Sequence, residues 1–211
     1  MDQVEPEANR ARSSRAWFSA SIEEFRRTDA ETILGHIAKY AEYDVVLTQR
    51  NTWLAQIEIL RSALSELNGD IFFEFTVPRL GRRIDVVLLI GATVFAIEFK
   101  VGEHDFKRAA LDQVWDYALD LKNFHEASHA VFVAPILIAT EARSVPLAIY
   151  RDDDGVYRPL TVTPTELPAA IAAIVERSQG SHRSDQLGDS TISSDPYNRR
   201  SSSIALCAAL R

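Results

Sequence analysis

Two apolar runs joined by a short glycine-containing turn constrain the fold of this chain more than any other feature. The runs cover residues 83–90 and 93–100, and only Gly91-Ala92 separates them. A two-residue connection of this kind is typical of a β-hairpin, so we expect two antiparallel strands. The runs nevertheless contain three charged residues, Asp85, Glu98 and Lys100. Because an unpaired charge in a buried strand is very costly, these side chains need partners or a ligand.

The alternation of side chains along a strand predicts how the three charges are placed. Glu98 and Lys100 share one face of their strand, and Asp85 is expected to share a face with Arg83 and Val87 on the other. Twelve residues separate Asp85 from Glu98, which puts both acids at the same end of the hairpin. Two converging carboxylates repel each other unless a hard cation lies between them, and Mg²⁺ prefers oxygen ligands. A structural cluster of salt bridges at a sheet edge is the alternative interpretation.

The rest of the chain predicts an α/β core with additional N-terminal helices. A helix over 47–67 precedes the strand 71–77 and the hairpin, and a helix over 105–124 and an apolar strand over 130–139 follow it. The core order is therefore helix, three strands, helix, strand, with a mixed sheet. We also expect short helices over 21–27 and 32–40, weaker strands near 147–150 and 156–162, and a final helix over 165–177.

Composition predicts one soluble domain with unstructured ends. We expect a disordered lead over 1–15, one domain over 16–177 and a disordered Ser/Arg-rich tail over 178–211. The single cysteine, Cys207, excludes an internal disulfide framework. No signal peptide or membrane-spanning apolar run is present, which predicts a cytoplasmic location. The net charge of −7 argues mildly against a general basic surface for nucleic acid.

The spacing Asp-x12-Glu-x-Lys, between one helix and another, resembles the PD-(D/E)XK nuclease superfamily, with Ile84 in place of the proline. The pair Gln113 and Tyr117 on the following helix resembles the RecB-like branch. The resemblance implies a restriction-endonuclease-like core and a nuclease acting on DNA with Mg²⁺ or Mn²⁺. It assigns the metal to Asp85, Glu98 and the Phe99 carbonyl, and the positioning of water to Lys100.

The same resemblance suggests roles for residues around this site. Gln113 and Tyr117 would orient it, and Glu58, on the helix before the sheet, would be an additional metal-binding acid. Three arginines would contact phosphates: Arg79, Arg82 and Arg83. Taken alone, each has an ordinary alternative, since Gln113 and Tyr117 suit a helix face packed on a sheet, Glu58 a solvated helix and the arginines a solvated turn.

More narrowly, about three-fifths of the chain resembles the N-terminal module of an uncharacterised bacterial family. Its members join such a module to a Schlafen-group-3-like DNA/RNA helicase domain. The matching segments are 49–60, 73–88, 97–102, 113–125 and 135–140. No G-x-x-x-x-G-K-[ST] sequence is present, so we expect a standalone module or a truncated gene, with any helicase or ATPase supplied elsewhere.

Two other functions stay open. A PD-(D/E)XK fold also serves as a non-catalytic module that binds nucleic acid or a partner protein. Residues 125–129 (HEASH) match H-E-x-x-H, the signature of zinc metallopeptidases. Because the motif falls at the predicted end of a helix, immediately before a buried strand, we interpret its histidines as complementing the helix dipole.

Overall fold

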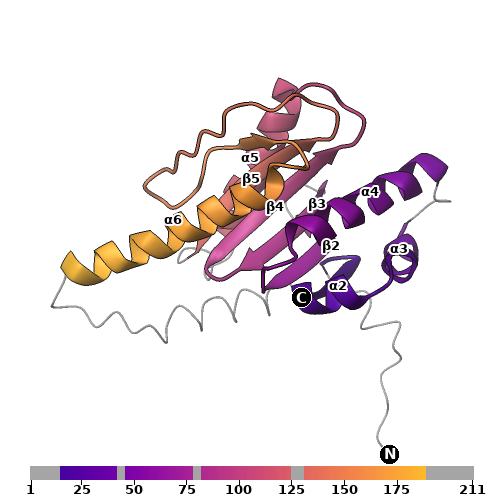
Figure 1. Ribbon diagram of the computed structural model, residues 1–211, viewed down its shortest axis with the longest axis horizontal. Coiled ribbons are helices and arrows are strands. Elements are labelled where there is room, and N and C mark those ends of the chain that lie inside the picture. The colour runs from indigo at the N-terminus through magenta and orange to yellow at the C-terminus, as the bar shows by residue number, and fades with distance from the viewer. Residues whose placement is uncertain (1–14, 42–45, 78–81, 125–130, 189–211) are drawn as a thin grey trace, which may run out of the picture.

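The computed structural model describes residues 15–41, 46–77, 82–124 and 131–188, and they form an α/β structure around one mixed six-stranded sheet (Figure 1). The strands, in their order across the sheet, are β1 (Phe18–Ser21), β2 (Asp70–Val77), β3 (Arg82–Ile90), β4 (Thr93–Lys100), β5 (Phe132–Ala139) and β6 (Leu160–Val162). The helices are α2 (Ile22–Arg27), α3 (Ala30–Ala38), α4 (Leu47–Ala63), α5 (Arg108–Phe124) and α6 (Leu167–Gly188).

The first four strands form an antiparallel meander, and the last two are parallel to β4. The predicted hairpin is confirmed: Ile90 pairs with Thr93 across the turn. Gly91 has a φ of 59°, a left-handed conformation that glycine adopts without steric cost. The helix α5 connects β4 to the parallel strand β5, as a crossover between parallel strands requires.

Helices cover both faces of the sheet. One face packs against α2, α3, α4 and α6 through a large apolar cluster that includes Trp53, Ile97 and Ile171. The other face packs against α5, where Tyr117 and Leu121 meet Ala96 and Val133. Figure 1 shows α4 and α6 lying across the same side of the sheet. A sheet covered on both faces explains why β4 and β5 are almost continuously apolar.

The main departures from the predicted elements are at the edges. The strand β1 falls where no strand is expected, because it has only four residues and pairs on one side with β2. Residues 147–150 form no strand, and the predicted strand 156–162 is reduced to β6 and two isolated bridges, at Val156 and Tyr157. The helix α4 ends at Ala63, four residues before the expected end.

The final helix, expected over 165–177, continues as α6 to Gly188. Ser178 is buried, and its hydroxyl shares a hydrogen bond with that of Tyr157 at 3.1 Å. This contact attaches the helix to the body of the domain at a position where the local composition indicates disorder. The lead over 1–14 and the tail over 189–211 lie outside the described residues.

The side-chain alternation of β2 and β3 changes at one pair of positions. Ile71 and Phe73 pack on the face covered by α4. Phe75, two residues further along, would be expected on the same face but packs on the α5 side. The intervening residue, Glu74, has a φ of 51°, which is unusual for a residue with a side chain. The neighbouring strand changes in the same way at Asp85, since Ile84 packs with Val87. Arg83 therefore does not share a face with Val87 as predicted.

Within the described ranges, none of the helices combines the length and apolarity needed to cross a membrane.

Candidate functional site

Asp85 and Glu98 lie side by side at the end of the β3–β4 hairpin. The last registered pair is Val86–Ile97, and the next position along both strands brings the two acids opposite each other. The Phe99 N–H donates to Asp85 Oδ2 at 2.8 Å, so the strand backbone fixes the Asp85 carboxylate. Glu98 is only 4% exposed, whereas Asp85 is partly buried. The hairpin thus brings together the two acids that the sequence predicted to converge.

The pKa values of both acids are raised. Burial raises the pKa of Asp85 well above its usual range, and the charge of Glu98 raises it further, against the opposing Phe99 hydrogen bond. Burial also raises the pKa of Glu98, although the hydrogen bond and charge of Lys100 oppose this shift. In both cases, burial favours the protonated form because it removes water from the charged one. Ionisation of both groups is therefore costly in the absence of a cation, and a bound cation would offset this cost.

The two oxygens of Glu98 have different surroundings. Oε1 accepts from Lys100 Nζ at 2.8 Å and from Gln113 Nε2 at 3.0 Å. Oε2 is buried and accepts no hydrogen bond from the described residues. A buried carboxylate oxygen without a donor is uncommon in folded proteins, and such oxygens often bind an ion. This oxygen is therefore available for a cation.

Gln113 and Tyr117 connect the site to the helix α5. Gln113 Nε2 also lies 2.7 Å from Tyr117 Oη, and that hydroxyl donates to the Arg83 carbonyl at 3.0 Å. Burial raises the pKa of Tyr117, with the hydrogen bond from Gln113 opposing the shift. The hydroxyl therefore remains a neutral donor at physiological pH. Gln113 and Tyr117 thus link Glu98 on β4 to the Arg83 carbonyl on β3. These contacts hold α5 against the hairpin at the position of the two acids.

Glu74 is a third acid near the site, and the motif that marks the other two does not include it. It is 8% exposed, and its charge raises the pKa of both Asp85 and Glu98. Its carboxylate accepts from Trp53 Nε1 at 2.8 Å and from Arg83 Nε at 2.9 Å. The sequence does contain a signal for it, because an acid inside the aromatic run of β2 is as unexpected as Asp85 inside β3.

The other predicted residues are more dispersed. Glu58 is exposed on α4 and belongs to none of the contacts around Glu98 described above. Arg82 is exposed at the start of β3, and Arg83, two residues before Asp85, is paired with Glu74. Arg79 and the HEASH segment over 125–129 lie outside the described residues, so the zinc-binding alternative keeps its status as a hypothesis.

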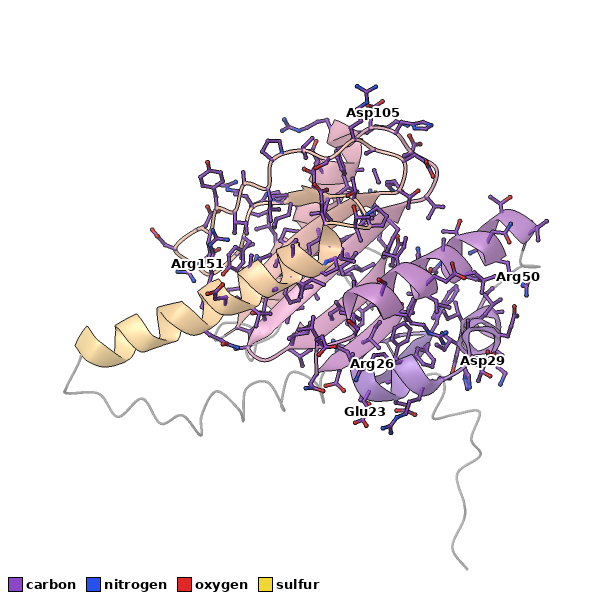
Figure 2. The ribbon with its side chains drawn as sticks, in the orientation of Figure 1. Glu23, Arg26, Asp29, Arg50, Asp105 and Arg151 are labelled. Atoms are coloured by element: carbon purple, nitrogen blue, oxygen red, sulfur yellow. The ribbon has the colours of Figure 1, made fainter. Side chains whose placement is uncertain are left out.

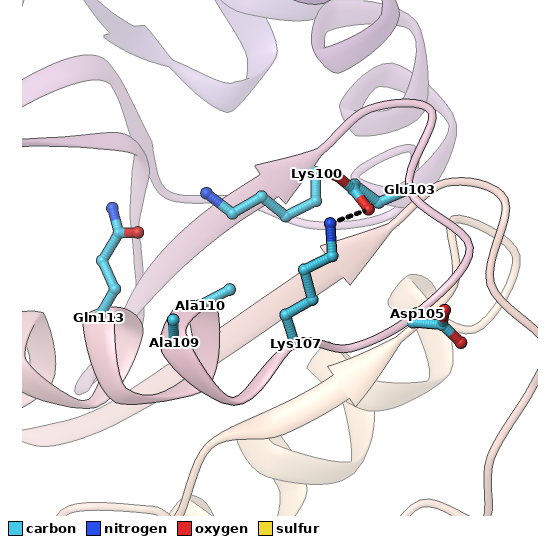
Figure 3. A pocket seen from close by; sticks show the side chains of 7 residues that line it. All are labelled: Lys100, Glu103, Asp105, Lys107, Ala109, Ala110 and Gln113. Carbon is cyan, nitrogen blue, oxygen red and sulfur yellow. Dashed lines mark ion pairs between the residues drawn. The ribbon is translucent and has the colours of Figure 1, made fainter.

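A hollow of about 280 Å³ opens beside Lys100 and Gln113 (Figure 3). Its wall continues into the loop after β4 and the start of α5, through Glu103, Asp105 and Lys107. Lys107 pairs with Glu103 at 2.6 Å across the loop. The side chains of Lys100 and Gln113 thus belong both to the acidic site and to the wall of this hollow.

The donor set fits a hard cation with few protein ligands. Asp85, Glu98 Oε2 and the Phe99 carbonyl provide only oxygen atoms, which suits Mg²⁺ or Mn²⁺. Within the described ranges, no group of three or more His, Cys, Asp or Glu side chains is arranged to hold a metal ion. Magnesium commonly keeps several waters and is completed by substrate phosphates, so two carboxylates and one carbonyl are sufficient for such a site.

No family model and no curated protein matches the sequence. Among solved structures, the chain is similar to protein VC1899 from Vibrio cholerae, with a TM-score of 0.30 and 11% sequence identity. The match covers 82% of this chain and 49% of the other, so the chain spans about half the length of that protein. A likeness at this level carries no argument about function.

Proposed function

We propose that this domain is a nuclease that hydrolyses phosphodiester bonds of DNA with Mg²⁺ or Mn²⁺, on a restriction-endonuclease-like core. One observation carries the proposal: Asp85 and Glu98 converge with raised pKa values beside Lys100, and Glu98 Oε2 has no donor among the described residues. A purely structural ion pair does not need the second acid. The order of helix, hairpin, helix and parallel strand supports the same superfamily.

Each residue of the site has a distinct role in this proposal. Asp85, Glu98 and the Phe99 carbonyl hold the ion. When bound, Mg²⁺ would polarise a phosphoryl oxygen and lower the pKa of a bound water. Lys100 places its ammonium next to Glu98, where it can orient the attacking water and stabilise the charge that develops on the phosphate.

Gln113 and Tyr117 act on the geometry of the acids. Gln113 donates to Glu98 Oε1, the same oxygen that Lys100 contacts, so Oε2 is the oxygen that would be left to hold a cation. Tyr117 fixes the amide of Gln113 and links it to the β3 backbone. These contacts hold the carboxylate in one orientation, and a preorganised site loses less free energy when it binds the ion and the transition state.

Cleavage assays with labelled linear duplex, circular duplex, single-stranded DNA and RNA test the proposal. We expect DNA to be cut with Mg²⁺ or Mn²⁺ and left intact with EDTA. Lys100→Ala should lower the rate by about 100-fold or more, the usual loss when one charge-stabilising group is removed. The control is Arg50→Ala, which removes an exposed cation paired with Glu31, outside the site.

The outcomes separate the alternatives. Cleavage that survives both EDTA and Lys100→Ala refutes the assigned site. DNA binding without turnover in either metal refutes catalysis and supports a non-catalytic module. Stoichiometric zinc that is lost on His125→Ala supports the metallopeptidase instead.

A further inference from the structure

The Arg83 side chain, two residues before Asp85 in β3, is held in place on two sides. Its guanidinium carbon lies 4.2 Å from the centroid of the Trp17 ring, and its Nε donates to Glu74 at 2.9 Å. Trp17 in turn meets Trp53 edge-on, with the ring centroids 6.2 Å apart. Trp53 closes the arrangement by donating to the other oxygen of Glu74. We call this set of four residues the arginine clamp.

The clamp leaves part of the guanidinium available. The Nε–H and one planar face are occupied, whereas the two terminal Nη groups have no hydrogen-bond partner among the described residues. The Arg83 side chain is 42% exposed and that of Glu74 only 11%. The carboxylate of the pair is therefore buried, whereas much of the Arg83 side chain is accessible. The two Nη groups of an arginine form a fork that suits the oxygens of a phosphate.

The position of Glu74 is costly, which argues that the clamp has a purpose beyond stability. A residue with a side chain at a φ of 51° inside a strand carries backbone strain. Its charge also repels Asp85 and Glu98. A simple surface ion pair requires neither cost. Arg83 stands two residues before Asp85, and its own carbonyl accepts the Tyr117 hydroxyl, so its backbone is linked through Tyr117 and Gln113 to Glu98.

We infer that Glu74 is a positioning residue that, together with Trp17, holds the Arg83 guanidinium in one orientation to bind a backbone phosphate of a nucleic acid. The inference rests on the proposed function for the identity of the ligand. It does not require cleavage, because a phosphate held by Arg83 serves a binding module as well as a nuclease.

A purely electrostatic role and a positioning role of Glu74 predict opposite changes in nucleic-acid affinity when Glu74 is replaced by glutamine. Glu74→Gln removes a negative charge next to the proposed phosphate site, so electrostatics alone predicts tighter binding. Positioning predicts weaker binding, because the amide cannot form the ion pair that orients Arg83. The sign of the change therefore distinguishes a positioning role from a merely electrostatic or structural one.

The experiment measures the affinity for labelled single-stranded and duplex oligonucleotides as a function of salt, in a Lys100→Ala background that prevents cleavage. We expect Arg83→Ala to weaken binding about tenfold and to reduce the salt slope by about one. Glu74→Gln should weaken binding about three- to tenfold, by disordering the same contact. Combined with Arg83→Ala, it should cause no further loss. Arg83→Lys should restore little, since a lysine does not reproduce the stacked, forked geometry.

The matched control is Glu23→Gln, which removes the same charge from an exposed ion pair on α2. In Figure 2, Glu23 lies at the bottom of the molecule, whereas Asp105, which lines the hollow beside Lys100, lies at the top. We expect this control to change the affinity less than twofold. Thermal melting and near-ultraviolet circular dichroism verify the fold of each variant. If Glu74→Gln does not fold, Trp17→Leu tests the other wall of the clamp with the same expected loss.

Tighter binding by a folded Glu74→Gln variant overturns the inference, as does equal weakening by Glu74→Gln with and without Arg83. Absence of any oligonucleotide binding by the parent protein overturns it as well. Binding with the expected clamp effects but without cleavage by the Lys100-containing protein supports the inference and refutes only the nuclease activity.

Discussion

Replacing Asp85 by asparagine is expected to stabilise the metal-free protein while abolishing its response to divalent cations. The change removes one of two adjacent ionisable carboxyl groups. It retains the hydrogen bond from the Phe99 N–H, because the asparagine side chain still has a carbonyl oxygen that can take the position of Oδ2. The shape is nearly unchanged, so the effect of charge is isolated from that of packing.

The magnitude follows from the position of the two acids. Residues directly opposite on antiparallel strands have Cβ atoms about 5 Å apart, and two like charges at about this distance repel by about 3 kcal/mol at an effective dielectric constant of about 20. Lys100 beside Glu98 offsets part of this repulsion, and the partial exposure of Asp85 screens more. We therefore expect a gain of about 1–2 kcal/mol, or about 3–6 °C in Tm for a domain of this size.

Thermal melting with EDTA and with Mn²⁺ measures both effects. The unsubstituted protein should melt at a higher temperature when Mn²⁺ is added, because the ion binds only the folded state. Asp85→Asn should melt higher than the unsubstituted protein in EDTA and show no shift with Mn²⁺. A variant that melts lower in EDTA refutes the idea that the two acids repel, and a retained Mn²⁺ shift refutes Asp85 as a ligand. Asp112→Asn, an exposed acid on α5 paired with Arg108, is the control for the loss of charge alone.

Three further results are expected. The stability of the metal-free protein should fall as the pH rises from about 4 through the raised pKa values of Asp85 and Glu98, because the folded state retains protons that the unfolded state has released. A pH series of melting curves in which stability rises over this interval contradicts the assignment. Mn²⁺ binding should tighten over the same interval and release protons, which calorimetry in buffers of different ionisation enthalpy detects; affinity independent of pH is the contrary result. Glu74→Gly should be more stable than Glu74→Ala by about 1 kcal/mol in urea unfolding, because glycine accepts a positive φ whereas alanine does not; equal stabilities imply that the backbone at this position relaxes.

The hairpin and its acids are predictable because their determinants are local. The Gly91-Ala92 turn, the apolar runs on both sides and strict alternation place Glu98 next to Lys100 without knowledge of any distant residue. The four-residue spacing of Gln113 and Tyr117 likewise ensures that they share one helical face. The structure agrees, and it adds that the two side chains contact each other and that Gln113 contacts Glu98.

An acid inside the aromatic run of β2 is visible in the sequence, but the role of Glu74 is not, because its partners are distant in the sequence. Trp53 lies 21 residues before it and Arg83 nine residues after it, and only the packing of α4 against β2 brings the three together. The same packing reverses the alternation at Phe75, which a period of two cannot predict. The continuation of α6 to Gly188 is also not predictable from local patterns. The burial of Ser178 on this helix involves a contact with Tyr157, which is distant in the sequence.

The sequence by itself determined the α/β order, the hairpin and the pair Asp85 and Glu98, because turn geometry and side-chain period act over a few residues. Only the tertiary structure decided the state of these acids. Whether a carboxylate is buried, which oxygen receives a donor and which arginine is held beside it depend on contacts between elements far apart in the chain. The Oε2 of Glu98, which has no donor among the described residues, and the clamped Arg83 are therefore properties of the folded domain, and they carry the two functional proposals.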